Sequence, residues 1–458
     1  MLHDTAVVIL AAGQGTRMKS RKAKVLHRAG GKTLVRHAID AALEIAPPGR
    51  IFVVVGHQAE AVRAEVEAAG VGVIHQTEQL GTGHALMCGE AELSGLGGSL
   101  VVCMGDCPLI RSEALAGLAE SQQRSGAGAT LLTTDLDDPT GYGRIIRNAD
   151  GSVREIVEHR DATPEQRAVR EINSGVYSFD AKAFWRHVHE IRNENPAREY
   201  YLTDMVAILI RAGRRVEAHK IADSSGLLGI NNKVELAAAD RIFRERKVRE
   251  LMLAGVTIEK PETVTIDSGV QVGADTVIGP FAQITGDSVI GENCHIGACS
   301  IIHSSVLGDE AEVFPFTLIS SSRLDAGAHA GPFARLRMDA HLGAGAHVGN
   351  FVELKKTKLG AGSKSMHLAY LGDSVIGAKS NIGAGTITCN YDGRNKHATV
   401  IGDGAFIGSN STLVAPLEIA DGAYIGAGST ITHNVPARSL AVGRARQVLK
   451  EGWKKKGL

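Results

Sequence analysis

The chain has 458 residues, with 50 Lys and Arg side chains against 50 Asp and Glu, and aromatic residues make up 4% of it. This length exceeds what one hydrophobic core usually serves, so we expect two domains. The balanced charge and the few aromatic residues argue against nucleic-acid partners. No apolar run reaches the roughly 20 residues of a membrane span, and the six cysteines form no CxxC pair, so we expect a cytoplasmic protein without stable membrane insertion.

The first predicted element is a buried strand over Thr5–Leu10, an apolar run that leads into a loop containing Gly13 and Gly15. A strand followed by a glycine-rich loop and a helix presents backbone N–H groups to phosphates. Two common fingerprints are absent. Met18 stands where a Rossmann fingerprint needs its third glycine, and Leu26 stands where a P-loop needs its first.

Helix and strand patterns then alternate. A helix is predicted over residues 34–44, and strands are predicted over Ile51–Val55 and Ser99–Met104. This alternation predicts an α/β domain with a mostly parallel sheet. Ligands of such sheets bind at the carboxyl ends of the strands.

Charged side chains lie near these predicted strand ends. Arg17 and Lys24 suit a polyphosphate, and Asp106 suits a divalent cation. A simple turn role for Asp106 before Pro108 is the alternative.

A helix is predicted over residues 233–254, ended by Gly255 and Pro261. We interpret it as an arm, which gives a first domain over residues 1–232, a helical linker over 233–255 and a second domain over 256–458.

From about Val264 to Ala441 the chain repeats every six residues, with an aliphatic residue followed by glycine. This period suits short strands joined by tight corners, with the aliphatic side chain inside, glycine at the bend and small residues where coils stack. The repeat breaks near residues 320–323 and at 388–399. The clear copies begin at Val272, Ile278, Ile290, Ile296, Leu342, Val348, Ile376, Ile382, Ile401, Ile407 and Ile425.

The repeat resembles the hexapeptide pattern of the left-handed parallel β-helix, and this resemblance implies the handedness and the triangular coil. A filled prism has no internal pocket, so ligand sites are expected on its faces, at an inserted loop or between chains. The loop at 388–399 is the candidate; a surface loop without a role is the alternative.

Several stretches of the first half form recognisable motifs: LAAGQGTRM at 10–18, KVL at 24–26, QLGTGHA at 79–85, DPTGYGR at 138–144, VEH at 157–159, EINSG at 171–175 and GINN at 229–232. By these stretches the first half resembles the sugar nucleotidylyltransferases that make UDP-N-acetylglucosamine, which implies a Rossmann-like nucleotidylyltransferase domain.

This resemblance implies uridylyl transfer from UTP to N-acetylglucosamine-1-phosphate, with Arg17 and Lys24 stabilising phosphate charge. It also implies that Asp106 and Asn231 hold Mg²⁺. The nucleotide and sugar would be bound by Leu10, Ala11, Ala12, Gly13, Lys24, Gln76, Gly81, Thr82, Gly143, Glu158, Asn173 and Asn231.

The second half carries four further motifs: GPFARLR at 331–337, VGNFVELKK at 348–356, HLAYLGD at 367–373 and NIGAGTITCNYDG at 381–393. By these stretches it resembles the acetyltransferase half of a bifunctional family that joins this uridylyltransferase to a glucosamine-1-phosphate N-acetyltransferase. The resemblance covers nearly the whole chain and implies a homotrimer that uses acetyl-CoA.

A general base assists acetyl transfer to an amine, and histidine titrates in the right range. The resemblance selects His367 from the 18 histidines. It implies that glucosamine-1-phosphate is bound by Arg337, Lys355, Tyr370 and Asn381, and acetyl-CoA by Ala384, Asn390, Tyr391, Ser409, Ala427 and Arg444.

The chain departs from the family pattern at three positions. Ala23 replaces a proline before the lysine and predicts a looser lysine loop, and Met104 replaces an aromatic residue. Met366 before His367 has no interpretation.

Three alternatives stay open: a single-activity nucleotidylyltransferase, a non-catalytic trimerisation scaffold formed by the β-helix, and a zinc-dependent β-helix carbonic anhydrase. The last is disfavoured because His341 and His347 have no evident third partner.

Overall fold

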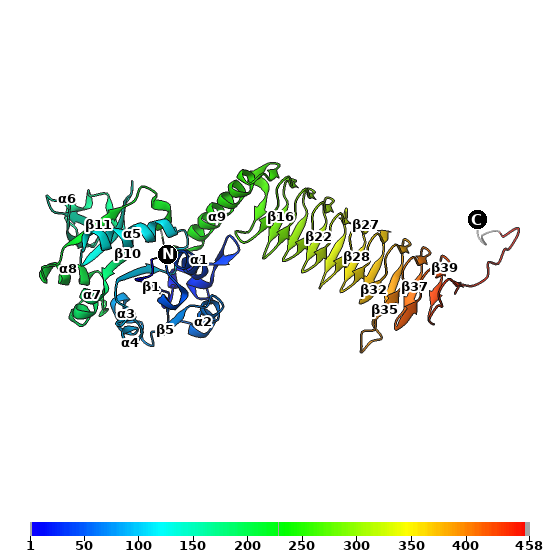
Figure 1. Ribbon diagram of the computed structural model, residues 1–458, viewed down its shortest axis with the longest axis horizontal. Coiled ribbons are helices and arrows are strands. Elements are labelled where there is room, and N and C mark those ends of the chain that lie inside the picture. Colours follow the sequence, from blue (N-terminus) through cyan, green and yellow to red (C-terminus); the bar gives the residue numbers. More distant parts are fainter. Residues whose placement is uncertain (1, 228, 454–458) are drawn as a thin grey trace. The chain divides into compact units, whose positions relative to one another are not determined.

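The computed structural model describes residues 2–227 and 229–453. It contains two compact units, Met1–Phe243 and Arg244–Leu458, one built on a mixed sheet and the other a stack of coils (Figure 1). Among the helices of the described residues, none is long and apolar enough to span a bilayer.

The first unit is organised around one sheet. Strand β10 runs antiparallel to both of its neighbours in the main path, and the other neighbouring strands of that path are parallel, so the predicted mostly parallel sheet is confirmed. The order is β11 (Val216–Lys220), β7 (Ala129–Asp135), β10 (Glu171–Asp180), β6 (Ser99–Met104), β1 (Thr5–Leu10), β4 (Ile51–Val55) and β5 (Gly72–His75). A side branch adds β8 (Arg144–Arg147) and β9 (Val153–Val157), and a separate pair is formed by β2 (Arg28–Ala29) and β3 (Lys32–Thr33).

Both faces of this sheet are covered. Along β1, Val7 and Ile9 point into one core and Ala6 and Val8 into the other, as expected for a strand buried on both faces. The α-helices are α1 (Leu34–Ile45), α2 (Ala59–Glu67), α3 (Thr82–Met87), α4 (Glu90–Leu93), α5 (Ser112–Ser125), α6 (Pro164–Arg167), α7 (Ala181–His187), α8 (Asp204–Arg211) and α9 (Lys233–Leu253). The short 3₁₀ helices are η1 (Thr16–Met18), η2 (Lys24–Leu26), η3 (Pro48–Arg50), η4 (Val188–Glu190), η5 (Ser224–Leu227) and η6 (Pro261–Thr263).

Helix α9 contributes to both units, since the boundary along the chain falls between Phe243 and Arg244. Ala239, near its start, is buried in a small apolar cluster with Ala29 and Leu34. Val248 and Leu251, near its end, belong to the core of the second unit.

The second unit is a parallel β-helix with three faces, in which each strand pairs with the matching strand of the next coil. The first face holds β12 (Thr257–Ile258), β15 (Val277–Ile278), β18 (His295–Ile296), β21 (Glu312–Val313), β24 (His329–Ala330), β27 (His347–Asn350), β30 (Lys364–His367), β33 (Asn381–Ile382), β36 (Phe406–Ile407), β39 (Tyr424–Ile425) and β41 (Leu440–Ala441). The second face holds β13 (Thr265–Ile266), β16 (Gln283–Thr285), β19 (Ile301–His303), β22 (Leu318–Ser320), β25 (Arg335–Arg337), β28 (Glu353–Lys355), β31 (Tyr370–Gly372), β34 (Ile387–Cys389), β37 (Thr412–Val414) and β40 (Thr430–Ile431). The third face holds β14 (Gln271–Val272), β17 (Val289–Ile290), β20 (Val306–Leu307), β23 (Arg323–Leu324), β26 (His341–Leu342), β29 (Lys358–Leu359), β32 (Ser374–Ile376), β35 (Thr399–Ile401) and β38 (Leu417–Ile419).

The aliphatic residues of the repeat fill the prism as predicted, but the role predicted for its glycines is wrong. The repeat glycine Gly343 is not in a left-handed conformation. A Cβ added to it would lie 2.7 Å from the backbone nitrogen of Ala361 on the next coil. Corner residues with positive φ include the non-glycines Phe316 and Asn293, at 63° and 53°. The repeat glycines therefore allow coils to stack closely and do not supply the bend.

The two predicted breaks in the repeat differ. Residues 320–323 carry no insertion: β22 passes into β23 through a corner of two residues, Ser321 and Ser322. Between β34 and β35, by contrast, the segment 390–398 is inserted. The first predicted break is therefore wrong as a loop, and the second is a loop.

The sequence is rich in lysine over residues 450–456, and the structure describes this stretch as far as Trp453, which is exposed. Lys454, Lys455 and Lys456 lie outside the described residues.

Candidate functional site

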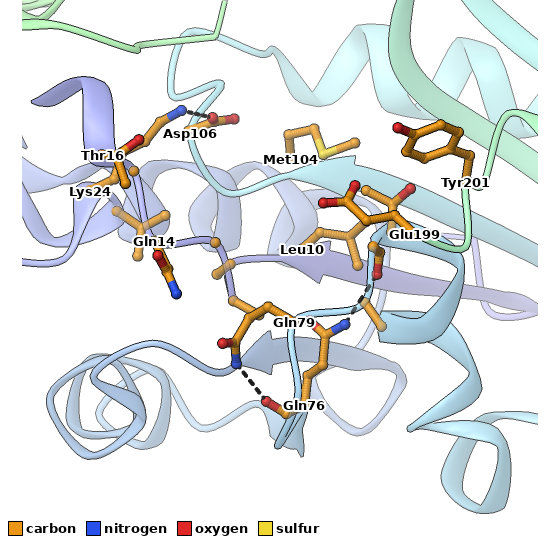
Figure 2. A pocket seen from close by; sticks show the side chains of 18 residues that line it. Leu10, Gln14, Thr16, Lys24, Gln76, Gln79, Met104, Asp106, Glu199 and Tyr201 are labelled. Carbon is orange, nitrogen blue, oxygen red and sulfur yellow. Dashed lines mark hydrogen bonds and ion pairs between the residues drawn. The ribbon is translucent and has the colours of Figure 1, made fainter. Parts of the chain in front are cut away.

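The first unit has a cavity of about 630 Å³ at the carboxyl ends of its parallel strands (Figure 2). The ends of β1 and β6 contribute Leu10 and Met104, and the loops that follow close its walls. The predicted residues that line it are Leu10, Ala11, Ala12, Gly13, Lys24, Gln76, Gly81, Thr82 and Asp106.

Lys24 lies where oxygen atoms of two distant segments converge. Its Nζ forms an ion pair with Asp106 and donates to Oδ1 of Asn231 at 2.9 Å, and Arg17 donates to the same oxygen at 2.9 Å. The Ile230 N–H ties the two segments together by donating to the Asp106 carbonyl at 2.9 Å. The structure thus gathers the four residues predicted for phosphate and metal binding.

The carboxylate of Asp106 and the amide oxygen of Asn231 are hard oxygen donors, and a positive charge already stands between them. They fit Mg²⁺, which usually binds one or two carboxylates and takes its other ligands from substrate phosphates and water. Within the described residues, no group of three or more His, Cys, Asp or Glu side chains is placed to hold a metal ion.

Gly15 sets how closely the glycine-rich loop approaches Lys24. Its φ is 63°, and a Cβ there would lie 2.5 Å from Cβ of Lys24. Glycine is therefore needed twice, for its backbone conformation and for the approach of the lysine.

The structure holds the lysine loop at Ala23 by a contact that a proline could not make. Ala23 is buried, has a φ of −52° and donates its N–H to Oε1 of Gln58 at 2.8 Å. The Gln58 amide in turn donates to the carbonyl of Arg21. A proline could not make the first hydrogen bond, since it has no N–H, so Gln58 fixes the loop here.

Gln76 holds the other wall of the cavity. Its Nε2 donates to the carbonyl of Gly81 at 3.1 Å, and Gln79 donates to the Gln76 carbonyl at 3.1 Å (Figure 2). The same Nε2 lies 3.1 Å from Nδ1 of His84. These contacts fix the loop that leads into α3 with Gly81 and Thr82 facing the cavity.

Three of the residues predicted to bind the nucleotide and sugar form a second group: Gly143, Glu158 and Asn173. The Asn173 N–H donates to the Gly143 carbonyl at 2.9 Å, and a Cβ at Gly143 would lie 3.4 Å from Oε1 of Glu158. Burial, and to a smaller extent Asp161, raises the pKa of Glu158. Met104 lines the cavity and packs near Gly175, where an added Cβ would lie 3.3 Å from Cε of Met104. The Gly175 N–H donates to Oδ1 of Asn173 at 3.2 Å, so Gly175 links Met104 to this group.

Two cavity residues, Glu199 and Tyr201, lie outside every stretch of the sequence that carried a prediction (Figure 2). Their segment is held against the cavity loop because the Tyr200 N–H donates to Leu80 at 2.7 Å and Gly83 donates to the Tyr200 carbonyl at 2.7 Å. They lie more than a hundred positions beyond Gly81 in the sequence, in a stretch without a chemical motif, and no sequence signal pointed to them.

In the second unit, three of the four residues predicted to bind the sugar phosphate lie on the second face: Arg337, Lys355 and Tyr370. Arg337 and Lys355 are register partners in β25 and β28. Arg337 donates to Oε1 of Glu353 at 2.7 Å, and the buried Lys355 Nζ lies 2.9 Å from Oδ2 of Asp373. Two cations from adjacent coils are thus held side by side.

Asn390 and Tyr370 join this cluster. Asn390 donates to Oδ2 of Asp373, and a Cβ at Gly372 would lie 2.6 Å from the Tyr370 hydroxyl and 2.7 Å from Nδ2 of Asn390. Lys396, which was not predicted, lies beside Lys355. A hydrogen bond with Lys355, followed by the charge of Lys355, lowers the pKa of Lys396.

The inserted loop 390–398 is held by its own side chains. Asp392 accepts hydrogen bonds from the N–H groups of Arg394 and Asn395 at 2.7 Å and lies 2.7 Å from Nε2 of His397. The hydrogen bonds from Asn395 and His397 lower the pKa of Asp392 to about 2. Tyr391 is exposed on this loop.

The remaining acetyl-CoA residues form a column along the corner between the first and second faces. The backbone N–H of Asn410 donates to the Ala384 carbonyl at 2.7 Å, and that of Gly428 donates to the Ser409 carbonyl at 2.8 Å. The Arg444 side chain donates to the Ala427 carbonyl. Each predicted residue therefore lies one coil from the next.

His367 belongs to the same corner. It ends β30, is exposed and pairs with Asn350, while its neighbour Leu368 accepts from Gly385, next to Ala384, at 3.1 Å. Asn381 lies on the first face, in register with Lys364. Strand β31 separates this corner from the Lys355 cluster, so one chain carries the two groups at opposite edges of its second face.

Comparisons with known proteins cover both halves. Residues 7–172 match the MobA-like NTP transferase domain, and residues 269–304 and 398–433 match the bacterial transferase hexapeptide family of six repeats. The β-helix is accordingly left-handed.

Relatives also match nearly the whole chain, and therefore both of its halves. The bifunctional protein GlmU of Solibacter usitatus (strain Ellin6076) is 60% identical over 100% of this chain and 98% of its own length. Those of Koribacter versatilis (strain Ellin345) and Anaeromyxobacter dehalogenans (strain 2CP-C) are each 48% identical over 98% of this chain and over 96% and 92% of their own lengths.

These matches run through both units, and this continuity favours two activities over a nucleotidylyltransferase with an inert scaffold. The chain therefore belongs to the family of the bifunctional protein GlmU, in which a uridylyltransferase half precedes an acetyltransferase half.

Proposed function

We propose that the cavity of the first unit binds UTP and N-acetylglucosamine-1-phosphate for uridylyl transfer. The sugar phosphate oxygen attacks the α-phosphorus of UTP and pyrophosphate leaves, so the protein supplies position and charge and needs no nucleophile of its own. Arg17 and Lys24 lie beside the glycine-rich loop, where they neutralise phosphate charge. Glu158, Asn173 and Gly143 hold the sugar, which the connection through Met104 supports.

Asp106 and Asn231 are proposed to hold Mg²⁺, which would neutralise phosphate charge when bound. The observation that carries this assignment is the convergence of their oxygens on one cation, the ammonium group of Lys24. When the phosphates arrive, Lys24 exchanges these oxygens for phosphate oxygens and keeps its charge paired.

The substitution Asp106→Asn tests this assignment in the full chain. Uridylyl transfer should fall by orders of magnitude and require more Mg²⁺, while acetyl transfer in the same sample stays normal. An unchanged Mg²⁺ requirement would place the metal elsewhere.

In the second unit, His367 is proposed as the general base for the amine of glucosamine-1-phosphate. Arg337 and Lys355 hold the phosphate, with Tyr370 and Asn381 completing the sugar site. Acetyl-CoA lies along the corner column, whose members are Ala384, Ser409, Ala427 and Arg444, and against Asn390 and Tyr391 of the loop. Ser409 donates to the developing oxyanion.

A homotrimer would complete this site. One chain carries the phosphate cluster and the column of His367 at opposite edges of its second face. A second copy placed against that face would bring its own edge to the phosphate cluster, which supports sites between chains. A monomer that acetylates at the full rate would overturn the trimer.

The domain limits 1–232, 233–255 and 256–458 are proposed to mark two independently working halves, since each unit has its own core. A chain shortened after Gly255 should keep uridylyl transfer and lose acetyl transfer. Loss of both activities in a well-folded short chain would contradict this.

A further inference from the structure

Asp373 ends the HLAYLGD stretch at 367–373, yet no role assigned so far uses it. It follows β31 with a φ of 48°, and its N–H donates to the Lys355 carbonyl at 2.9 Å. Its side chain is 13% exposed. Asp373 therefore lies between the coil of Lys355 and the coil that leads to Asn390.

A single oxygen atom of this carboxylate serves both neighbours. Oδ2 of Asp373 lies 2.9 Å from Nζ of Lys355 and accepts from Nδ2 of Asn390. The Lys355 side chain is only 6% exposed. An ammonium group buried to this extent needs a paired anion, because an uncompensated charge away from water is costly.

We propose that Asp373 is a positioning residue that holds Lys355 and Asn390 in one geometry, so that the phosphate subsite and the acetyl-donor subsite depend on the same carboxylate. The proposal rests on the roles proposed above for Lys355 and Asn390.

The surroundings leave little room for another arrangement. A Cβ at Gly372 would lie within 2.7 Å of both the Tyr370 hydroxyl and Nδ2 of Asn390, so only glycine lets these side chains meet. Burial opposes ionisation of Asp373, but the hydrogen bonds from Lys355 and Asn390 outweigh it and lower its pKa. The carboxylate is therefore an anion at neutral pH, and it pairs the charge of Lys355 until a phosphate arrives.

The test is Asp373→Asn in the full-length chain, with acetyl transfer measured while each substrate is varied. Asparagine keeps the shape and tolerates the left-handed backbone, so the change removes chiefly the charge. Hydrogen bonds to an ionised group are roughly twice as strong as neutral ones. Loss of the charge therefore weakens the hydrogen bonds from Lys355 and Asn390 together. KM should rise about tenfold for glucosamine-1-phosphate and about tenfold for acetyl-CoA, while uridylyl transfer in the same sample stays unchanged.

Asp309→Asn is the matched control. Oδ1 of Asp309 accepts from the Glu292 N–H at 2.9 Å, a structural contact between coils that uses no proposed site residue. This variant should leave both KM values unchanged. A purely structural role of Asp373 would make the two variants alike, with a lower Tm or less active protein and normal KM values.

A second measurement leaves Asp373 in place, in case its variant does not fold. Lys355→Gln and Asn390→Ala are made singly and together, and kcat/KM is compared. If the two residues act through one carboxylate, the double variant departs from the product of the single effects by at least about threefold.

Each other result has a defined meaning. Independent effects, or a rise in only one KM for Asp373→Asn, would overturn the shared role. If Lys355→Gln leaves the KM for glucosamine-1-phosphate unchanged, the proposed phosphate role of Lys355 fails first, and the inference fails with it.

Discussion

The cavity of the first unit draws its side chains from positions as far apart as Leu10 and Tyr201, whereas the candidate site of the second unit uses residues that follow one another coil by coil. In the sheet, several loops meet at one edge, and each side chain is placed by different packing. In the β-helix, the register that pairs Arg337 with Lys355 also places Asn410 on Ala384 and Gly428 on Ser409.

The two halves are therefore expected to be sensitive to different kinds of substitution. The β-helix depends on repeated contacts between coils, so a change in spacing at one coil should disturb the site several coils away. The sheet domain depends on individual hydrogen bonds that fix single loops, such as those of Gln76 and Gln58. Disturbing one half should leave the activity of the other intact.

The largest expected effect on stability comes from Gly343→Ala. The added Cβ would lie 2.7 Å from a backbone nitrogen of the next coil, which cannot move away as a side chain would. We expect a loss of about 3 kcal/mol, at the upper end of the range for overpacking, with acetyl transfer lost at a lower temperature. Thermal inactivation of both activities in the same sample measures it, and uridylyl transfer should be unaffected.

Gly345→Ala, two residues away, is its control. Gly345 has a φ of 63° and no atom within 4 Å of an added Cβ. Only backbone strain of about 1 kcal/mol is expected there. Equal losses for the two variants would contradict the stacking role of the repeat glycines.

A smaller and pH-dependent effect is expected at His37 in the first unit. Its ring stacks on Phe243 with centroids 3.8 Å apart, and its Nε2 lies 2.8 Å from the Ala29 carbonyl. Burial lowers the pKa of His37 to about 4, although the hydrogen bond to Ala29 acts in the opposite direction.

Because the unfolded chain binds this proton at a higher pH than the folded unit does, acid favours unfolding. The stabilisation is complete above pH 6.5 and is lost as pH falls from about 6.5 to about 4, by about 3 kcal/mol at most. His37→Gln keeps a donor for Ala29 and should remove this part of the pH dependence, as seen by urea unfolding of the first unit at pH 7.5 and pH 5. A pH dependence equal to that of the wild type would exclude His37 as its source.

The smallest effect concerns the lysine loop. Gln58→Ala removes two hydrogen bonds at an exposed position, each worth about 1 kcal/mol. Uridylyl kcat/KM should therefore fall several-fold while acetyl transfer is unchanged.

Adding Ala23→Pro to this variant should restore much of the rate, because the Ala23 φ of −52° is one that proline imposes. No rescue by Ala23→Pro would show that Gln58 acts by another route than holding this loop.

The sequence predicted more of the second unit than of the first because the repeat converts spacing into position. Once the period is known, residues one coil apart, such as Arg337 and Lys355, are expected to be neighbours, whereas the family resemblance selected these two as site residues. The predicted role of the repeat glycines was wrong, because the close approach of the backbones of two neighbouring coils produces no sequence pattern of its own. In the first unit, backbone hydrogen bonds of Tyr200 hold Glu199 at the cavity. The residue type of Glu199 plays no part in this, so no sequence signal pointed to it.

We propose that one chain carries two sites, each formed by residues of its own half. The most direct measurement is both activities of His367→Ala, purified as the full-length chain and compared with the wild type. Removing a general base costs about 10²–10⁴ in rate, so acetyl kcat should fall by that factor while both KM values, Tm and uridylyl transfer stay unchanged. A trimeric, thermally normal variant that acetylates within a few-fold of the wild type would show that His367 is not the base.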